Sequence, residues 1–286
     1  MMIDSHAHYT HGVYQNLFRY LTWSEDGYAL KEGNRAQLFQ ELLEAGIPYT
    51  IEVGVSLQSC QDVLQLAGEF PKRVFPAIGC HPTRTIRENW SERKKLSELA
   101  KAEGVIAIGE IGLDYHYKRE EQHRLKQHLW FLYQLNLAWK LKKSVILHVR
   151  DAHEDALRIL RHHPARKLGG VIHCFHQDWN VARQYLDLGY SIGIGGSVLQ
   201  LEEWSENFWE AVANIPLDRI LVETDAPFIL PYCKDVLPAK ALRRTRNTSL
   251  ILPAVIEKIA QLKGIPAEEV ERVVAENTIR LFSLPI

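Results

Sequence analysis

The chain has 286 residues, 46% of them hydrophobic, and its 34 basic and 35 acidic side chains give a net charge of −1. This length suits one α/β barrel of roughly 250 residues with insertions, and the composition supports a full core without disulfides. The balanced charge argues against a tight, non-specific binder of duplex DNA, because such proteins normally carry a clear basic excess. We therefore expect a single domain over residues 1–286.

The N-terminal sequence MMIDSHAH contains no basic or apolar leader, and no stretch approaches the roughly 18 continuous apolar residues of a membrane span. The four cysteines, Cys60, Cys80, Cys174 and Cys233, form no CxxC pair and are predicted to be reduced thiols. Together these features predict a cytoplasmic protein without membrane contact.

Short apolar runs typical of strands buried on both faces recur along the whole chain, at 2–5, 49–55, 74–79, 104–109, 144–149, 170–174, 190–195 and 219–223. Amphipathic, helix-like segments alternate with them, at 35–45, 58–69, 91–102, 120–141, 151–162, 178–188 and 205–213, and closing helices are predicted over 248–263 and 267–275. Asp151, with Glu154 three residues later, resembles an N-cap followed by a capping-box acid. Eight strands alternating with helices favour a single (β/α)8 TIM barrel over a doubly wound open sheet.

Three connections are long: 9–30, 111–119 and 226–246, after the first, fourth and eighth predicted strands. In a barrel, the segments that follow the strands lie on the catalytic face and shape the substrate site.

Side chains of metal-binding type stand at or near the ends of the apolar runs: His6, His8, Glu110, His148, His173 and Asp225. Because the C-terminal ends of barrel strands meet at one face, we expect these distant residues to lie together there. Four imidazoles and two carboxylates in one pocket are typical of a two-metal hydrolase site.

His6 and His8 are two residues apart on a predicted strand, so both side chains project to the same face and can hold one ion. Taken alone, they could equally be buried, hydrogen-bonded histidines. A carboxylate that closes an apolar strand, as Glu110 does, needs a cation or several donors. Glu110 could bridge two ions roughly 3.5–4 Å apart, or it could form a salt bridge with an arginine.

His148 and His173 are predicted to be the paired ligands of a second ion, although either one alone could be a core histidine. Asp225 could bind the first ion and take a proton from bridging water, so Asp225 and Glu110 are the candidate catalytic residues. Glu223 points to the same side of its strand as Asp225.

Substrate contacts are expected from His81, whose place after the third strand suits a hydrogen bond to phosphate, and from Arg150, Arg246 and Asn247. The arginines at 243–246 could bind nucleotides or could belong to a solvated turn. The aromatic insertion 9–30 could stack on bases or could be a lid packed on the barrel rim. The remaining histidines at 116, 123, 128, 153, 162 and 163 are predicted to lie on the surface, and those at 11 and 176 are left undecided.

The motifs SHAH, GCHP, GEIGLDY, ILHVR, HCF and ETDAP occur in the order and approximate spacing of TatD-type metal-dependent deoxyribonucleases, which are TIM barrels of the amidohydrolase superfamily. The chain resembles this family over nearly its whole length, including the NTIRLF tail. The resemblance implies two divalent ions (Zn²⁺, Mn²⁺ or Mg²⁺), the first held by His6, His8, Glu110 and Asp225 and the second by Glu110, His148 and His173. It also places His81 near the substrate.

The chain departs from the family pattern in two places. It reads Arg246-Asn247-Thr248-Ser249 where family members usually carry Arg-Asn-Glu-Pro, so an acid that contacts substrate or sheet is missing. The insertion after His8 is also long for the family and rich in aromatic residues. Both departures concern substrate scope more than metal chemistry.

The first functional hypothesis is hydrolysis of DNA phosphodiesters, in single strands or at 3′ ends, by a metal-bridged hydroxide. The same hydroxide would attack a carbonyl carbon, so an ester or amide hydrolase such as a D-aminoacyl-tRNA deacylase is the alternative. A third hypothesis is a metal-binding scaffold subunit of a defence complex. Four imidazoles suit Zn²⁺ or Mn²⁺ better than Mg²⁺ by ligand softness.

Overall fold

The structure is a computed structural model that describes residues 1–24, 27–116, 121–202, 204–232 and 243–286. Its contacts divide the chain into two compact units, each built from segments that are separated in sequence. Unit 1 comprises Met1–Ile51, Cys174–Ala182 and Gly193–Asn277, and unit 2 comprises Glu52–His173, Arg183–Ile192 and Thr278–Ile286. The expected single domain over residues 1–286 stays a prediction.

The main sheet has eight strands in chain order, and each was predicted from an apolar run. They are β1 (Ile3–Ala7), β4 (Tyr49–Val53), β5 (Val74–Ile78), β6 (Ala107–Asp114), β7 (Ser144–Arg150), β8 (Gly170–Ile172), β9 (Ser191–Ile194) and β10 (Ile220–Val222). The ladders from β5 to β9 are parallel. Strands buried on both faces read as continuous apolar runs, which is why the sequence pattern located them.

The described α-helices lie where amphipathic segments were predicted, within a few residues at most ends. They are α1 (Arg35–Glu44), α2 (Leu57–Glu69), α3 (Arg93–Leu99), α4 (Glu121–Leu141), α5 (His153–His162), α6 (Trp179–Asp187), α7 (Ser205–Asn214), α9 (Leu252–Lys263) and α10 (Ala267–Phe282). Short 3-10 helices are η1 (Gly12–Tyr14), η2 (Trp90–Glu92), η3 (Pro164–Leu168), η4 (Gly196–Leu199), η5 (Leu217–Arg219) and η6 (Ser249–Ile251). No helix among the described residues is both long and apolar enough to cross a membrane.

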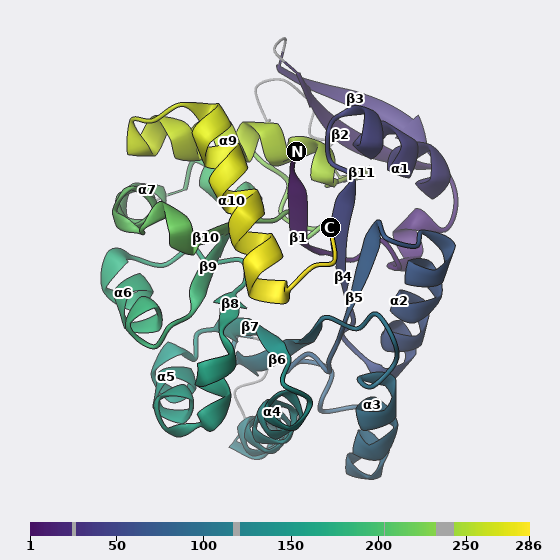
Figure 1. Ribbon diagram of the computed structural model, residues 1–286, viewed down its shortest axis with the longest axis vertical. Coiled ribbons are helices and arrows are strands. Elements are labelled where there is room, and N and C mark those ends of the chain that lie inside the picture. Colours follow the sequence, from purple (N-terminus) through teal and green to yellow (C-terminus); the bar gives the residue numbers. More distant parts are fainter. Residues whose placement is uncertain (25–26, 117–120, 203, 233–242) are drawn as a thin grey trace. The chain divides into compact units, whose positions relative to one another are not determined.

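The insertion after β1, which was predicted as a long connection or a lid on the barrel rim, forms part of a second sheet in unit 1. β2 (Phe18–Ser24) and β3 (Gly27–Gly33) pair as an antiparallel hairpin, and β11 (Thr245–Arg246) joins β2 in parallel (Figure 1). Trp23 and Tyr28 are cross-strand partners with ring centroids 4.7 Å apart, a contact that stabilises such pairs. The pairing of β11 with β2 joins segments more than 200 residues apart, so no local pattern indicates it.

Two local predictions were wrong. The fourth strand does not end before Glu110, because β6 continues to Asp114 with a register shift against β7 between Ile108 and Ile111. The N-cap of α5 is Ala152 and carries no side-chain cap, whereas Asp151 adopts a left-handed conformation (φ 51°) and pairs with His116.

Candidate metal centre

In unit 1, the end of β1 and the segment after β10 are joined by backbone hydrogen bonds. The Asp225 N–H donates to the His6 carbonyl at 2.9 Å, and the His8 N–H donates to the Ala226 carbonyl at 2.8 Å. A parallel bridge between Ala7 and Ala226 completes this junction. Residues at opposite ends of the chain are therefore neighbours in unit 1.

This junction brings His6, His8 and Asp225 together as the unit 1 cluster. The two Nε2 atoms are 3.1 Å apart, and Asp225 Oδ1 lies 3.2 Å from His8 Nε2 and 3.7 Å from His6 Nε2. His6 is fully buried and His8 nearly so, while the Asp225 side chain is 16% exposed. Two imidazole nitrogens and a carboxylate oxygen that face one another are the donor set of a divalent-metal site.

A buried carboxylate, that of Asp4, holds the backbone segments that carry the unit 1 cluster. Asp4 accepts hydrogen bonds from the backbone N–H groups of His6 and Thr224 and from the hydroxyls of Thr224 and Ser249, both at 2.6 Å. Burial raises the pKa of Asp4 to about 7, although these hydrogen bonds oppose the shift. Asp4 thus ties β1 to the segment that carries Asp225.

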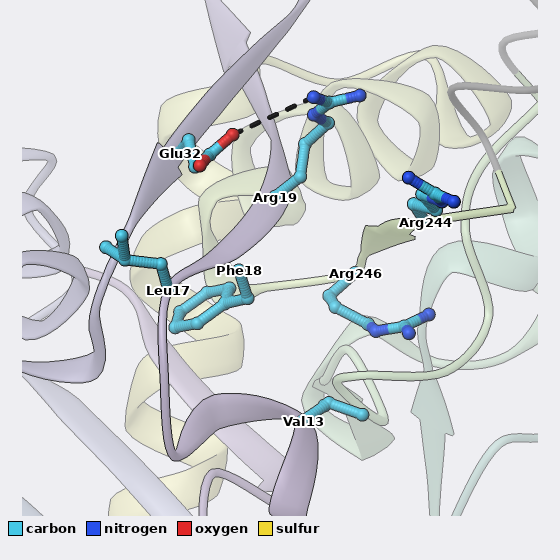
Figure 2. Close-up of a pocket in the computed structure, with 7 residues that line it drawn as sticks. All are labelled: Val13, Leu17, Phe18, Arg19, Glu32, Arg244 and Arg246. Atoms are coloured by element: carbon cyan, nitrogen blue, oxygen red, sulfur yellow. Dashed lines mark ion pairs between the residues drawn. The ribbon is translucent and has the colours of Figure 1, made fainter.

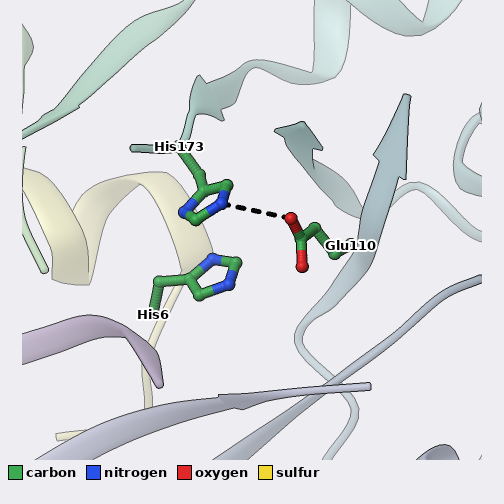
Figure 3. A group of neighbouring side chains, drawn as sticks. All are labelled: His6, Glu110 and His173. Atoms are coloured by element: carbon green, nitrogen blue, oxygen red, sulfur yellow. Dashed lines mark ion pairs between the residues drawn. The ribbon is translucent and has the colours of Figure 1, made fainter. Parts of the chain in front are cut away.

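In unit 2, three imidazoles converge on one oxygen of Glu110. Glu110 Oε1 lies 2.9 Å from His148 Nδ1, 3.1 Å from His173 Nε2 and 3.4 Å from His81 Nε2. Figure 3 shows the Glu110 carboxylate and the His173 ring, and a dashed line marks the ion pair between them. We call His81, Glu110, His148 and His173 the unit 2 cluster.

Asp114 is a member of this neighbourhood that the sequence analysis did not single out. His148 bonds Glu110 through Nδ1 and Asp114 through Nε2, the second at 2.9 Å. Histidines that bind metals commonly donate their other ring N–H to a carboxylate, which fixes the tautomer and the ring orientation. Asp114 is placed to do this for His148, and the only sequence signal was its position in GEIGLDY.

The charges of the unit 2 cluster favour an ionised Glu110. Burial opposes its ionisation, but the charges of His81 and His173 and the hydrogen bonds from His148 and His173 lower the pKa of Glu110 well below its usual range. Burial likewise opposes the charge on His148, yet hydrogen bonds to Asp114 and Glu110 raise the pKa of His148. Burial also opposes ionisation of Asp114, but the bond from His148 outweighs it and lowers the pKa of Asp114.

His81 presents an N–H donor. The Thr83 backbone N–H donates to His81 Nδ1 at 3.2 Å, so the proton of the neutral ring sits on Nε2. Burial lowers the pKa of His81, which favours that neutral form. The His81 side chain is 14% exposed, as a contact with substrate would require.

Helix α4 holds two of the strand ends of unit 2 through buried glutamines. Gln134 accepts from the Cys80 N–H at 2.7 Å and donates to the Cys80 carbonyl at 3.1 Å. Gln127 makes the same pair of bonds to the backbone of Asp114, both at 2.8 Å. The residues that precede His81 and orient His148 are therefore anchored to one helix.

A glycine allows β6 and β7 to approach closely beside Glu110. Gly112 has φ +146°, and a Cβ there would lie 1.9 Å from the His148 carbonyl oxygen. Any side chain at this position would push the two strands apart, together with the ligand residues that they carry.

The other predicted substrate residues have different surroundings. Arg246 is half-buried and lines a pocket of unit 1, and Arg150 is half-buried at the end of β7. Asn247 is completely buried. Its amide nitrogen donates to the carbonyls of Thr224 and Ile229, and its oxygen accepts from Thr248 N. Asn247 is thus placed as an anchor of the backbone, and nothing in the structure supports its predicted substrate contact.

Thr248 and Ser249, which replace the family's usual Glu-Pro, also bond within unit 1. The Thr248 hydroxyl donates to the Leu21 carbonyl in β2, and the Ser249 hydroxyl donates to Asp4. The Thr248 side chain therefore ties this segment to the hairpin β2–β3.

Phe228 is a second residue that the sequence analysis missed. Its ring is 48% exposed and makes edge contacts with His8 and His11, at centroid distances of 6.2 and 5.6 Å. Of the histidines predicted to lie on the surface, His163 is buried and accepts a hydrogen bond from Ala165 N, so that prediction was wrong.

Among the described residues, Cys60, Cys80 and Cys174 are free thiols, and their reduced state stays a prediction. Cys233 lies outside the described residues, together with the rest of the stretch 233–242 in the predicted long connection 226–246.

Eight parallel strands form a nearly closed barrel with helices between them, which confirms the predicted (β/α)8 class. Clusters of imidazoles and carboxylates beside the strand ends of such a barrel define the class of metal-dependent hydrolases. The family described as 'TatD related DNase' matches residues 3–283. The chain therefore belongs to the TatD family and is a metal-dependent hydrolase.

Individual relatives agree with this assignment. The chain is 33% identical over 283 residues to the 'Uncharacterized metal-dependent hydrolase YcfH' of Escherichia coli (strain K12), covering 99% of this chain and 96% of that protein. It is 32% identical over 251 residues to the '3'-5' ssDNA/RNA exonuclease TatD' of Rahnella sp. (strain Y9602), covering 88% and 93%. The crystal structure of YJJV, a TatD homologue from Escherichia coli K12, matches with a TM-score of 0.81 and 25% identity over 99% and 98% of the two chains.

Proposed function

We propose that this protein hydrolyses phosphodiester bonds of single-stranded DNA, with two divalent ions as cofactors. Membership of the TatD family and a relative named as an exonuclease of single-stranded DNA and RNA support the choice of substrate. The observation that carries the proposal is the pair of donor clusters, each with imidazole nitrogens and a carboxylate oxygen within bonding distance of one another.

The proposed ligands of the first ion are His6, His8 and Asp225, and those of the second are Glu110, His148 and His173. A bridging role for Glu110 follows from the resemblance to TatD-type nucleases. Divalent ions in such a site lower the pKa of water and neutralise charge on the phosphoryl group. The donor types leave Zn²⁺, Mn²⁺ and Mg²⁺ as candidates, with the imidazoles favouring the first two.

Three side chains have further roles in this proposal. The Asp225 carboxylate accepts the proton of the attacking water, which suits a partly exposed carboxylate beside two imidazoles. The Nε2–H of His81 donates to a phosphoryl oxygen. The exposed ring of Phe228 stacks on a base next to His8, and such stacking contributes about 1–3 kcal/mol per base.

The test is metal-dependent cleavage of a labelled single-stranded oligonucleotide, measured by the rate at which product appears with Mn²⁺, Zn²⁺ or Mg²⁺. The variants Glu110→Gln and His8→Asn should each lose at least about 100-fold in rate, because each removes a ligand. The exposed His162 on α5 provides a matched control, and His162→Gln should retain the wild-type rate.

Two outcomes would contradict the proposal. Full activity of both ligand variants would exclude the clusters from the reaction. In a parallel assay, faster hydrolysis of D-aminoacyl-tRNA than of DNA would identify an ester hydrolase instead.

A further inference from the structure

A basic pocket lies in unit 1 beside the second sheet. Its volume is about 460 Å³, and the residues that line it are Val13, Leu17, Phe18, Arg19, Glu32, Arg244 and Arg246 (Figure 2). The hairpin β2–β3 and β11 hold four of these lining residues, and two more, Leu17 and Arg244, adjoin these strands. The pocket is therefore built largely by the second sheet.

The wall of this pocket carries an excess of positive charge. Arg19 pairs with Glu32 at 3.7 Å, and both side chains are substantially exposed (Figure 2). Within the described part of the chain, neither Arg244 nor Arg246 has an acidic partner. Three guanidinium groups and one carboxylate thus line the pocket, in a protein whose net charge is −1. Guanidinium groups keep their charge and match phosphate oxygens with two parallel hydrogen bonds.

Hydrogen bonds connect the pocket to the unit 1 cluster. Arg246 adjoins Asn247, whose amide donates to the carbonyl of Thr224, the residue before Asp225, at 2.9 Å. Val13, which also lines the pocket, belongs to η1, and Tyr14 of the same helix donates from its hydroxyl to the Asn247 carbonyl at 2.5 Å. Hydrogen bonds through Asn247 therefore link the walls of the pocket to the segment that carries Asp225.

We propose that this pocket binds backbone phosphates of a nucleic-acid strand whose scissile bond lies beside the unit 1 cluster. The volume suits one nucleotide unit, and Leu17, which is 69% exposed, offers an apolar surface to a sugar or base. The inference rests on the proposed nuclease function and extends it. The substrate is a chain of several nucleotides, and its affinity depends on chain length.

The experiment measures fluorescence anisotropy of labelled oligothymidylates of about four and about twelve nucleotides with the full-length protein in EDTA. Without divalent ions the strand is not cleaved, so binding is measured separately from catalysis. The wild type should bind the longer strand more tightly than the shorter one. In the double variant Arg19→Gln/Arg244→Gln, affinity for the longer strand should fall about tenfold and its salt dependence should weaken by about 0.7 per lost phosphate contact.

Two further variants separate the pocket from general charge. Arg272→Gln on α10 removes an exposed arginine that pairs with Glu276 at 2.9 Å, and it should bind like the wild type. Glu32→Gln releases Arg19 from its acidic partner, so affinity for the longer strand should rise about twofold or more. A gain in affinity cannot result from loss of folded protein. Thermal melting of every variant checks its folding.

The outcomes distinguish the pocket from the proposed reaction. Unchanged binding in the double variant, or an equal loss of affinity in Arg272→Gln, would contradict strand binding by the pocket even if DNA is cleaved. Inorganic phosphate that competes as well as the longer strand would also overturn it in favour of a small-anion site. Loss of length-dependent binding in the double variant supports the pocket even if cleavage is absent.

Discussion

Asp114 shows how a single side chain decides the orientation of a candidate ligand. It bonds the nitrogen of His148 that faces away from Glu110, and its own backbone is held by Gln127. A ligand ring that lost this partner would rotate more freely and would present a less basic nitrogen.

We therefore expect Asp114→Asn to weaken metal binding about 10- to 100-fold, because the amide removes the charge that orients and polarises His148. Isothermal titration with Mn²⁺ or Zn²⁺ measures this loss. The exposed Asp187 at the end of α6 is the matched control, and Asp187→Asn should leave metal affinity unchanged. If Asp114→Asn bound metal like the wild type, His148 would not depend on this carboxylate.

At the residue level, the sequence indicated most of the donors but not their supporting partners. His6, His8 and Asp225 were among the six donors predicted to meet at strand ends, and unit 1 brings these three together. Asp4 and Asp114 were missed because an acid in an apolar run carries no local sign of which donors it will meet. The hydrogen-bond acceptors of the Asn247 amide were not indicated for the same reason, since they lie about 20 positions away.

Helix α4 acts as a structural element that fixes two strand ends through buried amides. A buried glutamine in a helix is normally unfavourable unless both of its polar atoms are satisfied. Gln134 satisfies this condition by bonding both backbone groups of Cys80, next to His81. The helix therefore contributes to the site although none of its side chains belongs to the cluster.

The variant Gln134→Leu should lower the free energy of unfolding by about 2–4 kcal/mol, because the N–H and carbonyl of Cys80 would be buried without partners. Urea denaturation followed by circular dichroism measures the change. Gln65→Leu on the exposed face of α2 makes the same substitution without burying a backbone group, and we expect a change within about 0.5 kcal/mol. Equal effects of the two substitutions would refute the anchoring role of Gln134.

The elements themselves were largely predictable, with one informative exception. Strands and helices of the main sheet follow periodic patterns within short windows, so all eight strands were located. The hairpin β2–β3 was read as a connection because its pairing with β11 depends on residues far along the chain. The extension of β6 past Glu110 was missed because the register shift follows from pairing with β7.

For the whole molecule, the donor clusters predict that divalent ions stabilise the folded state. Removal of metal leaves ionised Glu110 beside three imidazoles, and binding an ion only in the folded form shifts the unfolding equilibrium. At an ion concentration of about 100 times the dissociation constant, stability should rise by about 2.7 kcal/mol, or about 5 °C in melting temperature.

Differential scanning calorimetry of the EDTA-treated protein, with and without added Mn²⁺ or Zn²⁺, measures this shift. Elemental analysis of the untreated protein gives the number of ions per chain. A melting temperature that stays unchanged with every divalent ion tested would contradict the metal centre and favour the scaffold hypothesis. The variant Glu110→Gln should show a smaller shift than the wild type.

The sequence by itself determined the order of the strands and helices of the main sheet, the (β/α)8 class and the residue types of the donor clusters. These follow from hydrophobic periodicity and from the position of polar residues beside apolar runs, which are properties of short segments. Tertiary structure alone decided the pairing of β11 with β2, the anchoring of Cys80 and Asp114 by α4, and the excess of arginines in the added pocket. The physical reason is that a hydrogen bond or ion pair requires two partners, and here the partners are brought together only by folding.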